Sequence, residues 1–371
     1  MRRLLVLIIS LFLNNTFAFA DCSTDDQLQF KSYNLRVEND YFNGTDNNYT
    51  SGISLSGVTH DLKGDTSVQC LPTITQFNTK LLTFLDNDIL KEQNGISKNM
   101  YFNLQQRMYT PTDVKTSTLI TNDRPYAGIV ELAVGVNERK IDHASSTQVL
   151  DTKELTLGVI GPASLAKQTQ NYWHTALGTF HSYGWDHQLT TEPALMYAYE
   201  RKIKTDLEQN SYTPGMSKDL IKYYGFNVGN ILTAAHIGIE GRYGLNIPND
   251  FGSDGNYPGC DNSAPTNSKS EICTDKGDLI KQIPQGAHAF AIAELTGVAY
   301  DFSLDGNMFS NDSHVHKNPA VGKLVVGVSS LVPMNNNRNL KLVLMQVIQT
   351  KEFEEQKKKH DYVSFNVGMD F

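Results

Sequence analysis

The final stretch of the chain reads Tyr362-Val363-Ser364-Phe365-Asn366-Val367-Gly368-Met369-Asp370-Phe371. Apolar side chains at the odd positions from Val363 to Phe371 alternate with small or polar side chains at the positions between them. A repeat of two residues is typical of a β-strand with one apolar and one polar face. The sequence therefore predicts that the chain ends in such a strand.

The other end of the chain has the features of an export signal. Met1-Arg2-Arg3 is basic, residues 4–13 are apolar, and Ala18-Phe19-Ala20 is a small-x-small cleavage site. The apolar part is too short to cross a bilayer, and no other stretch approaches the ~18 continuous apolar residues of a membrane helix. We expect residues 1–20 to be a signal peptide and residues 21–371 to form a periplasmic, secreted or β-barrel protein.

Composition narrows these classes. Loss of Arg2 and Arg3 with the signal peptide changes the formal net charge from -8 to -10, and an acidic chain lacks the basic surface that nucleic acid binding requires. The 17 Tyr and 17 Phe residues suit strands that are apolar on one face only. The four cysteines belong to an oxidising compartment, and we predict the disulfides Cys22–Cys70 and Cys260–Cys273.

Alternating apolar and polar residues predict twelve strands. An even number of strands of about ten residues is what a single-chain outer-membrane barrel requires, and a closed sheet leaves no unpaired edge in lipid. A terminal Phe also resembles the last strand of such barrels. We therefore predict an all-β fold, a transmembrane antiparallel β-barrel in the bacterial outer membrane. The predicted strands are residues 30–40, 49–62, 99–110, 125–139, 147–160, 187–204, 217–230, 233–245, 286–302, 320–333, 340–354 and 361–371.

The strand count assigns each loop to one side of the membrane. With the N-terminus in the periplasm, residues 41–48, 111–124 and 161–186 form the first three extracellular loops, and the four cysteines fall on the periplasmic side. Residues 246–285 then form a periplasmic loop that is long for such a barrel. Merging residues 217–245 into one strand would move that loop outside but would give an odd number of strands, so we keep twelve.

The first extracellular loop is dense in oxygen ligands. It contains Asn39, Asp40, Asp46 and Thr50, and carboxylates, amide carbonyls and hydroxyls are the ligands that Ca²⁺ prefers. Alternation places Asp40 and Thr50 on one face of the hairpin and Asn39 on the other, unless a bulge intervenes. Because the spacing is not that of an EF-hand, an ordinary Asn- and Gly-rich turn is the alternative.

The third extracellular loop contains a predicted helix. Residues 163–177 form it, with Ser164 as N-cap and Gly178 after the last turn. His174 lies on the polar face, and a neutral His can act as a general base near neutral pH. A solvated His on a surface helix is the alternative. The polar face consists of Lys167, Gln170, Asn171 and His174, and the opposite face of Leu165, Tyr172, Trp173 and Ala176.

Together these segments resemble the outer-membrane lipid A 3'-O-deacylase family. Three motifs occur in the family's order and cover about the first half of the mature chain. They are Asn39-Asp40 with Asp46-Asn47-Asn48-Tyr49-Thr50-Ser51-Gly52, then Asp123-Arg124-Pro125-Tyr126-Ala127-Gly128, and then Gly161-Pro162 through Gln170-Asn171, His174 and Gly178 to Gly184-Trp185, Gln188 and Glu192-Pro193.

The resemblance implies a twelve-stranded barrel with a Ca²⁺-dependent ester hydrolase site near its outer rim. The family removes the 3'-linked acyloxyacyl group from the lipid A part of lipopolysaccharide. Its His corresponds to His174, its Asn-Asp pair to Asn39 and Asp40, and its Thr to Thr50. His174 would take a proton from the attacking water, and Ca²⁺ at Asp40, Thr50 and Asp46 would stabilise the oxyanion. The implied partners are lipopolysaccharide and outer-membrane lipids.

The chain departs from the family at one position. Where a member of the family has a functional Glu six residues after the His, this chain has Phe180. One metal ligand is therefore missing or supplied by another residue. The candidates are Asp46, Asp123, Asp186 and Glu192.

Two other functions are compatible with an exported barrel. A serine-type outer-membrane phospholipase would need a Ser and a His paired on neighbouring strands, and the chain has no clear Gly-x-Ser-x-Gly motif. A non-catalytic porin or adhesin would leave the helix that carries His174 without a purpose.

Overall fold

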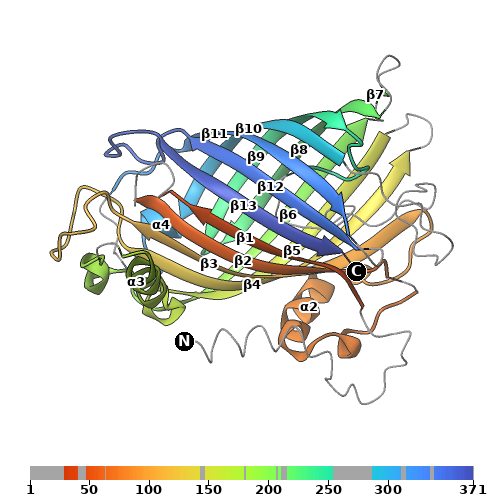
Figure 1. Ribbon diagram of the computed structural model, residues 1–371. Helices are drawn as coiled ribbons and strands as arrows, with labels where there is room; N and C mark the ends of the chain where they lie inside the picture. The colour runs from red at the N-terminus through yellow and green to blue at the C-terminus, as the bar shows by residue number, and fades with distance from the viewer. Residues whose placement is uncertain are drawn as a thin grey trace.

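Twelve long strands form one closed antiparallel barrel, as predicted (Figure 1). The computed structural model describes residues 29–40, 47–62, 64–142, 147–178, 181–205, 208–209, 215–253, 286–310, 315–334 and 338–370. Neighbouring strands pair in chain order, and the pairings of β1 with β13 and of β6 with β8 close the ring. The strands are β1 (Phe30–Asn39), β2 (Asn48–Thr59), β3 (Ile96–Thr110), β4 (Ala127–Asp142), β5 (Thr147–Ile160), β6 (Glu192–Thr205), β8 (Met216–Gly229), β9 (Leu232–Leu245), β10 (Gly286–Asp301), β11 (Ala320–Pro333), β12 (Asn339–Gln349) and β13 (His360–Asp370), with the two-residue β7 (Glu208–Gln209) extending the edge of β8.

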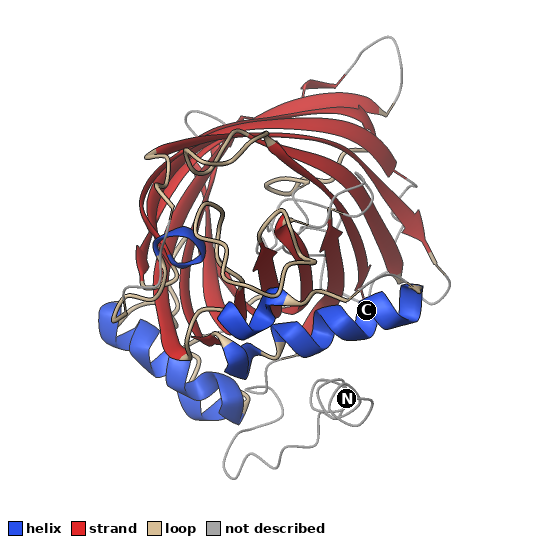
Figure 2. Ribbon diagram, turned by 90° about the vertical axis from the view of Figure 1, so that its left-hand side faces the viewer, coloured by secondary structure: helices blue, strands red, loops and turns tan. Residues whose placement is uncertain are grey.

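The helices lie outside or at the ends of the barrel (Figure 2). Helices α2 and α3 lie outside the ring of strands, and α4 lies at the same end of the barrel as α3. Among the described residues, no helix is long and apolar enough to cross a membrane. The helices are α2 (Thr73–Leu85), α3 (Ala166–Leu177) and α4 (Phe302–Asp305), with the short 3₁₀ turns η2 (Val68–Cys70), η3 (Pro162–Ser164) and η4 (Gly184–His187).

The closing strand behaves as its alternation predicts. In the pairing of β13 with β1, Phe365 lies opposite Val37. Both side chains are on the outer face, where Phe365 is 45% and Val37 is 38% exposed. Arg36 and Glu38, the alternate residues of β1, line a cavity of about 330 Å³ inside the barrel. An apolar outer face and a polar interior are what a lipid-embedded barrel requires.

The alternative of one merged strand over residues 217–245 is wrong. Strands β8 and β9 are separate and pair with each other in antiparallel register over their length. The chain reverses at residues 230–231, so the segment after β9 returns to the end of the barrel opposite α3 and α4. The predicted disulfides stay predictions, because Cys22, Cys260 and Cys273 lie outside the described residues, as does the signal peptide. Cys70 is in a disulfide.

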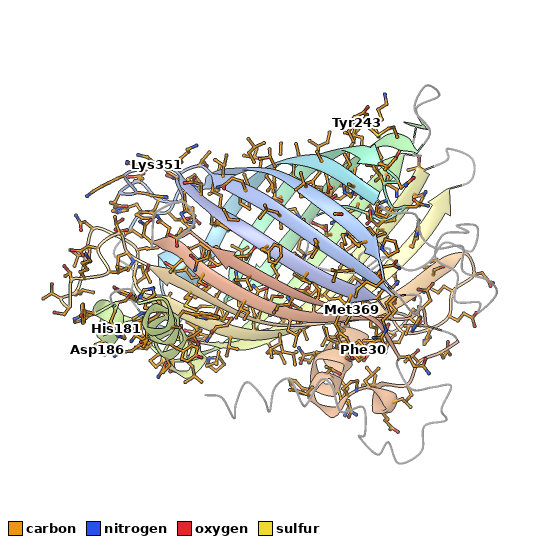
Figure 3. All side chains as sticks on the ribbon, in the orientation of Figure 1. Phe30, His181, Asp186, Tyr243, Lys351 and Met369 are labelled. Carbon is orange, nitrogen blue, oxygen red and sulfur yellow. The ribbon has the colours of Figure 1, made fainter. Side chains whose placement is uncertain are left out.

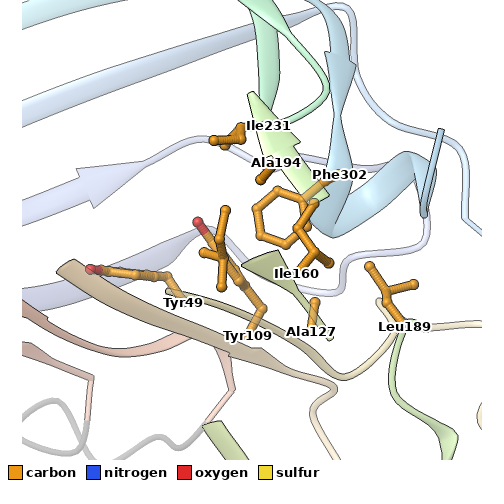
Figure 4. Packing of buried hydrophobic residues seen from close by; sticks show 9 residues of the cluster. Tyr49, Tyr109, Ala127, Ile160, Leu189, Ala194, Ile231 and Phe302 are labelled. Carbon is orange, nitrogen blue, oxygen red and sulfur yellow. The ribbon is translucent and has the colours of Figure 1, made fainter. Parts of the chain in front are cut away.

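An apolar cluster fills the end of the barrel next to α3 and α4 (Figure 4). Phe302 of α4 packs inside the barrel against the ring of Tyr109, with ring centroids 5.6 Å apart. Ile160 at the end of β5 and Ile231 in the turn between β8 and β9, both at most 1% exposed, belong to the same cluster. Because these side chains come from strand ends all around the ring, they hold this end of the barrel in shape.

Charged residues fill the opposite end. Arg242 of β9 is buried between two carboxylates, those of Asp219 on β8 and of Asp250 in the segment after β9. Lys204 of β6 donates to the main-chain carbonyl of Asp250, and its ammonium lies 5.1 Å from the ring centroid of Phe251. The segment 246–253 therefore turns inward and packs inside the barrel rather than leaving it.

We expect Asp250→Ala to destabilise the barrel by about 3–5 kcal/mol, because removing one partner of a buried ion pair leaves an uncompensated charge. The loss is large here because the buried guanidinium of Arg242 would keep only one of its two salt-bridge partners, Asp219, and buried Lys341 would lose its ion pair with Asp250. The temperature at which the folded barrel unfolds on a denaturing gel measures the effect. Asp186→Ala, which breaks an exposed ion pair, is the matched control and should leave that temperature unchanged. Equal unfolding temperatures for Asp250→Ala and the wild type would contradict this account of the charged end.

Candidate functional site

The predicted helix lies on the outer face of the barrel wall. The chain leaves β5 at Gly161, forms η3, and enters α3 after Leu165, which has a left-handed backbone with φ of 61°. Helix α3 begins at Ala166 rather than at residue 163, and the Ser164 hydroxyl accepts a hydrogen bond from the Ala166 amide at 3.4 Å. Gly178 ends the helix, with its amide donating to the carbonyl of His174. Figure 3 places His181 and Asp186, which follow α3, at the end of the barrel opposite Phe30 and Met369.

Gly128 explains how α3 comes so close to the wall. A Cβ atom on Gly128 would lie 2.3 Å from the Cβ of Ala166 and 2.5 Å from the Ser164 hydroxyl. The side chain of Gln106 on β3 donates to the Ser164 carbonyl at 2.6 Å from the same face of the wall. The glycine that closes the second motif is therefore the position where the third motif packs on the wall.

Trp185 fixes the rotation of α3 about its axis. Its indole is fully buried and donates to the Gln170 amide oxygen at 2.6 Å. The ring also packs against Tyr126, with centroids 5.0 Å apart, and a side chain on Gly184 would collide with Tyr126. Tyr126 and Gly184-Trp185 were recognised from the sequence as motif residues, and their role in the structure is to hold α3 in place.

As a result, α3 turns its polar face to the protein. Gln170 is only 3% exposed, and the Nδ1 atom of His174 is shielded from solvent. Tyr172 and Trp173 face outward and are 56% and 47% exposed. A helix on a water-soluble protein has the opposite arrangement. The polar side chains of α3 therefore lie between the helix and the wall, and its aromatic side chains face the membrane side.

We expect Gly128→Ala to reduce activity strongly while the barrel still folds, because the new methyl group requires α3 to move away from the wall. Gly241→Ala is the matched control: it adds the same atom to a strand glycine whose nearest neighbour would be 3.9 Å away. The ester hydrolysis that the sequence resemblance implies, normalised to folded protein on a gel, compares the two variants. Equal turnover for Gly128→Ala and Gly241→Ala would show that the packing of α3 on Gly128 does not matter.

The β1–β2 hairpin holds the other predicted residues. Asn39 ends β1, and its partner across the hairpin is Ser51. Asp40 follows it, is fully buried, and accepts a hydrogen bond from the Asn47 amide at 2.7 Å through Oδ2. The Oδ1 atom of Asp40 is also buried.

A bulge at Thr50 changes the faces that simple alternation predicts. The β2–β3 register shifts between Tyr49 and Ser51, and the Thr50 hydroxyl lies 2.6 Å from that of Thr110. Thr110 is two residues from Met108, which packs against Ala166 and Trp185 on the outer face. Thr50 is therefore on the same side of the wall as α3, and so is Asn39, which pairs with Ser51.

The strand pairing in the barrel wall shows how far the hairpin residues lie from the helix that carries His174. Ser51 is paired with Asn39 on one side and with Met108 on the other, and Met108 is paired with Gly128 beneath α3. Two strand spacings, roughly 10 Å, separate the backbones of Asn39 and Met108. The structure therefore places Asn39, Thr50 and the helix that carries His174 on one face at one end of the barrel. Asp46 and Phe180 lie outside the described residues.

Three of the acidic residues considered as replacement ligands have other roles. Asp123 accepts hydrogen bonds from the amides of Thr112 and Arg124 at 2.8 Å each, which holds the second loop. Asp186 is 79% exposed, and the hydrogen bond from Lys167 at 2.6 Å lowers its pKa. Glu192 accepts a hydrogen bond from Asn230 at 2.6 Å. Each of these three carboxylates is therefore already bonded to other groups of the protein.

Asn171 supplies an oxygen that the sequence did not single out as a ligand. It lies one turn before His174 on α3, and its buried Oδ1 has no hydrogen-bond partner among the described residues. The described residues contain no group of three or more His, Cys, Asp or Glu side chains that could hold a metal. The available donors, Asp40, Thr50 and Asn171, are all oxygens, which fits Ca²⁺ in kind, and Ca²⁺ takes six to eight of them.

Arg124 of the second motif is fully buried on the inner side of the wall. Its guanidinium donates to Glu352 at 3.2 Å and lies 5.2 Å and 5.6 Å from the ring centroids of Tyr109 and Phe353. Burial raises the pKa of the Glu352 carboxyl, and Arg124 opposes this rise. Arg124 therefore connects the loop between β12 and β13 to the second motif, and it is not among the residues beneath α3.

Comparisons with known proteins identify the family of the chain. The sequence model described as outer membrane protein LpxR matches residues 5–371. The chain belongs to the LpxR family. The resemblance found in the sequence motifs is thereby confirmed.

LpxR from Salmonella typhimurium has the same fold as this member of the LpxR family. The two structures have a TM-score of 0.63 at 16% sequence identity, over 92% of this chain and 100% of that chain. The β domain of the Bordetella autotransporter BrkA matches with a TM-score of 0.41 at 9% identity, over 92% of this chain and 97% of that chain, which is too distant to bear on function. No curated protein matches the chain.

Proposed function

We propose that this barrel is a lipid A 3'-O-deacylase that hydrolyses the 3'-linked acyloxyacyl ester of lipopolysaccharide in the outer leaflet. The observation that supports this most directly is the orientation of α3. Its polar side chains, His174 among them, are held against the outer face of the wall, while Tyr172 and Trp173 face the membrane side. A site on this outer face would be reached by lipid from the side and would need no passage through the barrel.

His174 is proposed as the general base. It would remove a proton from a water molecule as that water attacks the ester carbonyl, and later return the proton to the leaving sugar oxygen. Asn39, on the same face of the wall, would orient the imidazole or the water. The hydrogen bond from Trp185 to Gln170 fixes the rotation of α3 about its axis. It therefore also fixes the side of the helix on which His174 lies. No covalent intermediate on the protein is required.

Asp40 and Thr50 are proposed to hold Ca²⁺, with Asp46 and the amide oxygen of Asn171 as further donors. The bound ion would supply positive charge where the ester oxygen becomes negative. This role is supported by the burial of both side chains and by the contact of the Asp40 amide with the Thr50 carbonyl across the hairpin, at 3.4 Å. Asp40 is already oriented, because the Asn47 amide donates to one of its two oxygens.

A serine hydrolase has less support. Ser253 and His288 are hydrogen-bonded at 2.7 Å, but both are buried among the charged residues at the end of the barrel away from α3. That pair lacks access to lipid. A porin has less support as well, because packed side chains lie inside both ends of the barrel.

The purified protein, incubated with lipid A and Ca²⁺ and analysed by mass spectrometry, tests the activity and the bond that is cut. We expect release of one acyloxyacyl acid from the 3' position. Release of fatty acid from glycerophospholipid, together with labelling by a serine-directed fluorophosphonate, would instead favour the serine-type phospholipase. Solute flux through the protein in liposomes without hydrolysis would favour the porin.

A further inference from the structure

Helix α2 also turns polar side chains toward the barrel. Thr75, Asn78 and Thr79 face the wall and are at most 3% exposed. The stripe on the opposite side of the helix is apolar. Its members, with their exposed fractions, are Ile74 (62%), Phe77 (61%), Phe84 (82%) and Leu85 (58%).

The polar side chains of α2 are satisfied by hydrogen bonds in this orientation. The Asn78 side chain donates to the main-chain carbonyls of Leu132 on β4 and Leu155 on β5, at 3.1 Å and 3.3 Å. The Thr79 hydroxyl donates to the Thr75 carbonyl one turn earlier. Because Asn78 is bonded to two strands at once, the rotation of α2 is fixed. The apolar stripe is therefore directed away from the protein by specific contacts.

The helix lies beside the wall, within the length of the strands. Leu132 and Leu155 are interior residues of β4 and β5, away from the strand ends. Leu82 of α2 packs with Phe102 and Val134 on the outer face of the wall. Figure 1 shows α2 outside the barrel, in the half that is farther from α3. The stripe is therefore at a depth where the barrel surface itself faces the membrane.

We infer that the exposed stripe of α2 is embedded among phospholipid acyl chains of the periplasmic leaflet. The apolar surface of the barrel continues directly from the helix. Tyr197 on β6 packs against the cluster beneath α2, and Leu195, two residues along the same face, is 48% exposed. An apolar helix face at the membrane boundary binds lipid in proportion to the apolar area it buries. The phospholipid leaflet is the partner, because the helix lies at the end of the barrel opposite the lipopolysaccharide side.

Two charged residues of α2 and its C-terminal end fit this position. Lys80 is exposed beside the stripe, where its ammonium can reach the phosphate groups at the membrane surface. Asp86, directly after the helix, is bonded to Lys153 of β5 at 2.6 Å and fastens the end of the helix to the wall. This inference concerns the membrane contact of the barrel and is independent of the proposed enzymatic activity.

Photo-crosslinking tests the inference on the wild-type protein. The barrel is placed in phosphatidylethanolamine and phosphatidylglycerol vesicles that contain a phospholipid with a diazirine in its acyl chain, and adducts are mapped by peptide mass spectrometry. We expect adducts on Phe77 and Phe84 as abundant as those on Leu195, and none on residues 357–359. Labelling of Phe77 and Phe84 by a water-soluble diazirine but not by the lipid would overturn the inference. So would the joining of Lys80 in two copies by a separate bifunctional amine-reactive crosslinker, which would make the stripe a protein interface.

Two variants test whether the lipid contact depends on the apolar stripe or on the presence of the helix. Phe77→Ser with Phe84→Ser should lose most of the lipid adducts on Leu85 and should gain labelling by the water-soluble reagent. Gln76→Ser, on the flank of the same helix, should keep the wild-type pattern. Unchanged lipid adducts on Leu85 in the double variant would show that the stripe does not determine the lipid contact. Because the wild-type map is obtained separately, it remains decisive even if the double variant folds poorly.

Discussion

Replacing His174 with alanine is expected to lower turnover of lipid A by about 10²- to 10⁴-fold, the range that a positioned general base contributes. The expected loss is this large because Gln170 and Asn171 on the same face of α3 cannot take a proton, and Lys167 is paired with Asp186. KM should change little, since His174 is proposed to act on water rather than to bind the acyl chains. Initial rates with purified protein in detergent and Ca²⁺ measure the effect.

His187→Ala is the matched control for that experiment. His187 belongs to the same loop and is an exposed imidazole that lies 3.1 Å from the Ser117 carbonyl, away from the wall. It should turn over lipid A at the wild-type rate. If both His variants keep the wild-type rate, the base is another group and the mechanism proposed for α3 is wrong. If both lose activity equally, the loop rather than the imidazole is responsible.

Asp40→Asn should lower turnover by about 10²- to 10³-fold, the loss found when one group that stabilises an oxyanion is removed. The substitution keeps the size of the side chain and its hydrogen bond with Asn47 but removes the negative charge that would hold Ca²⁺. Raising the Ca²⁺ concentration should restore part of the rate in this variant. The wild type, in turn, should lose activity with a chelator and regain it when Ca²⁺ is returned.

Asp186→Asn is the control for this second experiment, because Asp186 is an exposed carboxylate in the third loop with a single lysine partner. It should leave both the rate and the Ca²⁺ dependence unchanged. Full activity of the wild type after removal of all divalent ions would exclude Ca²⁺ from the mechanism. Inactivity of Asp40→Asn at every Ca²⁺ concentration, with an unchanged Ca²⁺ requirement in Asp186→Asn, would assign Asp40 a role other than metal binding.

Much of the barrel could be predicted because lipid imposes a repeat on the strands. The last strand alternates between Val363 and Asp370, and it pairs with β1 in the register that places Phe365 beside Val37 on the outer face. The same repeat separated β8 from β9. Strand ends were harder to predict: β3 begins at Ile96 rather than at residue 99, because pairing with β4 continues beyond the alternating part.

For the two long helices, the sequence pattern did not determine which side of the helix faces the barrel wall. Helical spacing indicated α3 and its polar face, but not that this face would turn inward, because that choice depends on lipid being outside and on the bond from Trp185 to Gln170. Helix α2 was not predicted, although Ile74, Phe77 and Phe84 follow a helical repeat. In a barrel sequence, an apolar stripe of this kind indicates the membrane rather than a core.

The candidate site was predicted as separate residues rather than as an arrangement. Motif order gave Asn39, Asp40, Thr50 and His174, but alternation alone put Asn39 and Thr50 on opposite faces. The bulge at Thr50, which the sequence does not specify, brings both to the side of α3. Asn171 is a similar case, because its unpaired oxygen becomes visible only when its burial is known.

The most direct test of the central claim is mass spectrometry of lipid A from cells that express the wild type or His174→Ala at equal levels of folded barrel. If α3 holds a catalytic His against the outer wall, lipid A from cells with the wild type loses one acyloxyacyl group from its 3' position. Lipid A from cells with the variant keeps it. Identical lipid A from both, with Ca²⁺ supplied, would contradict the claim.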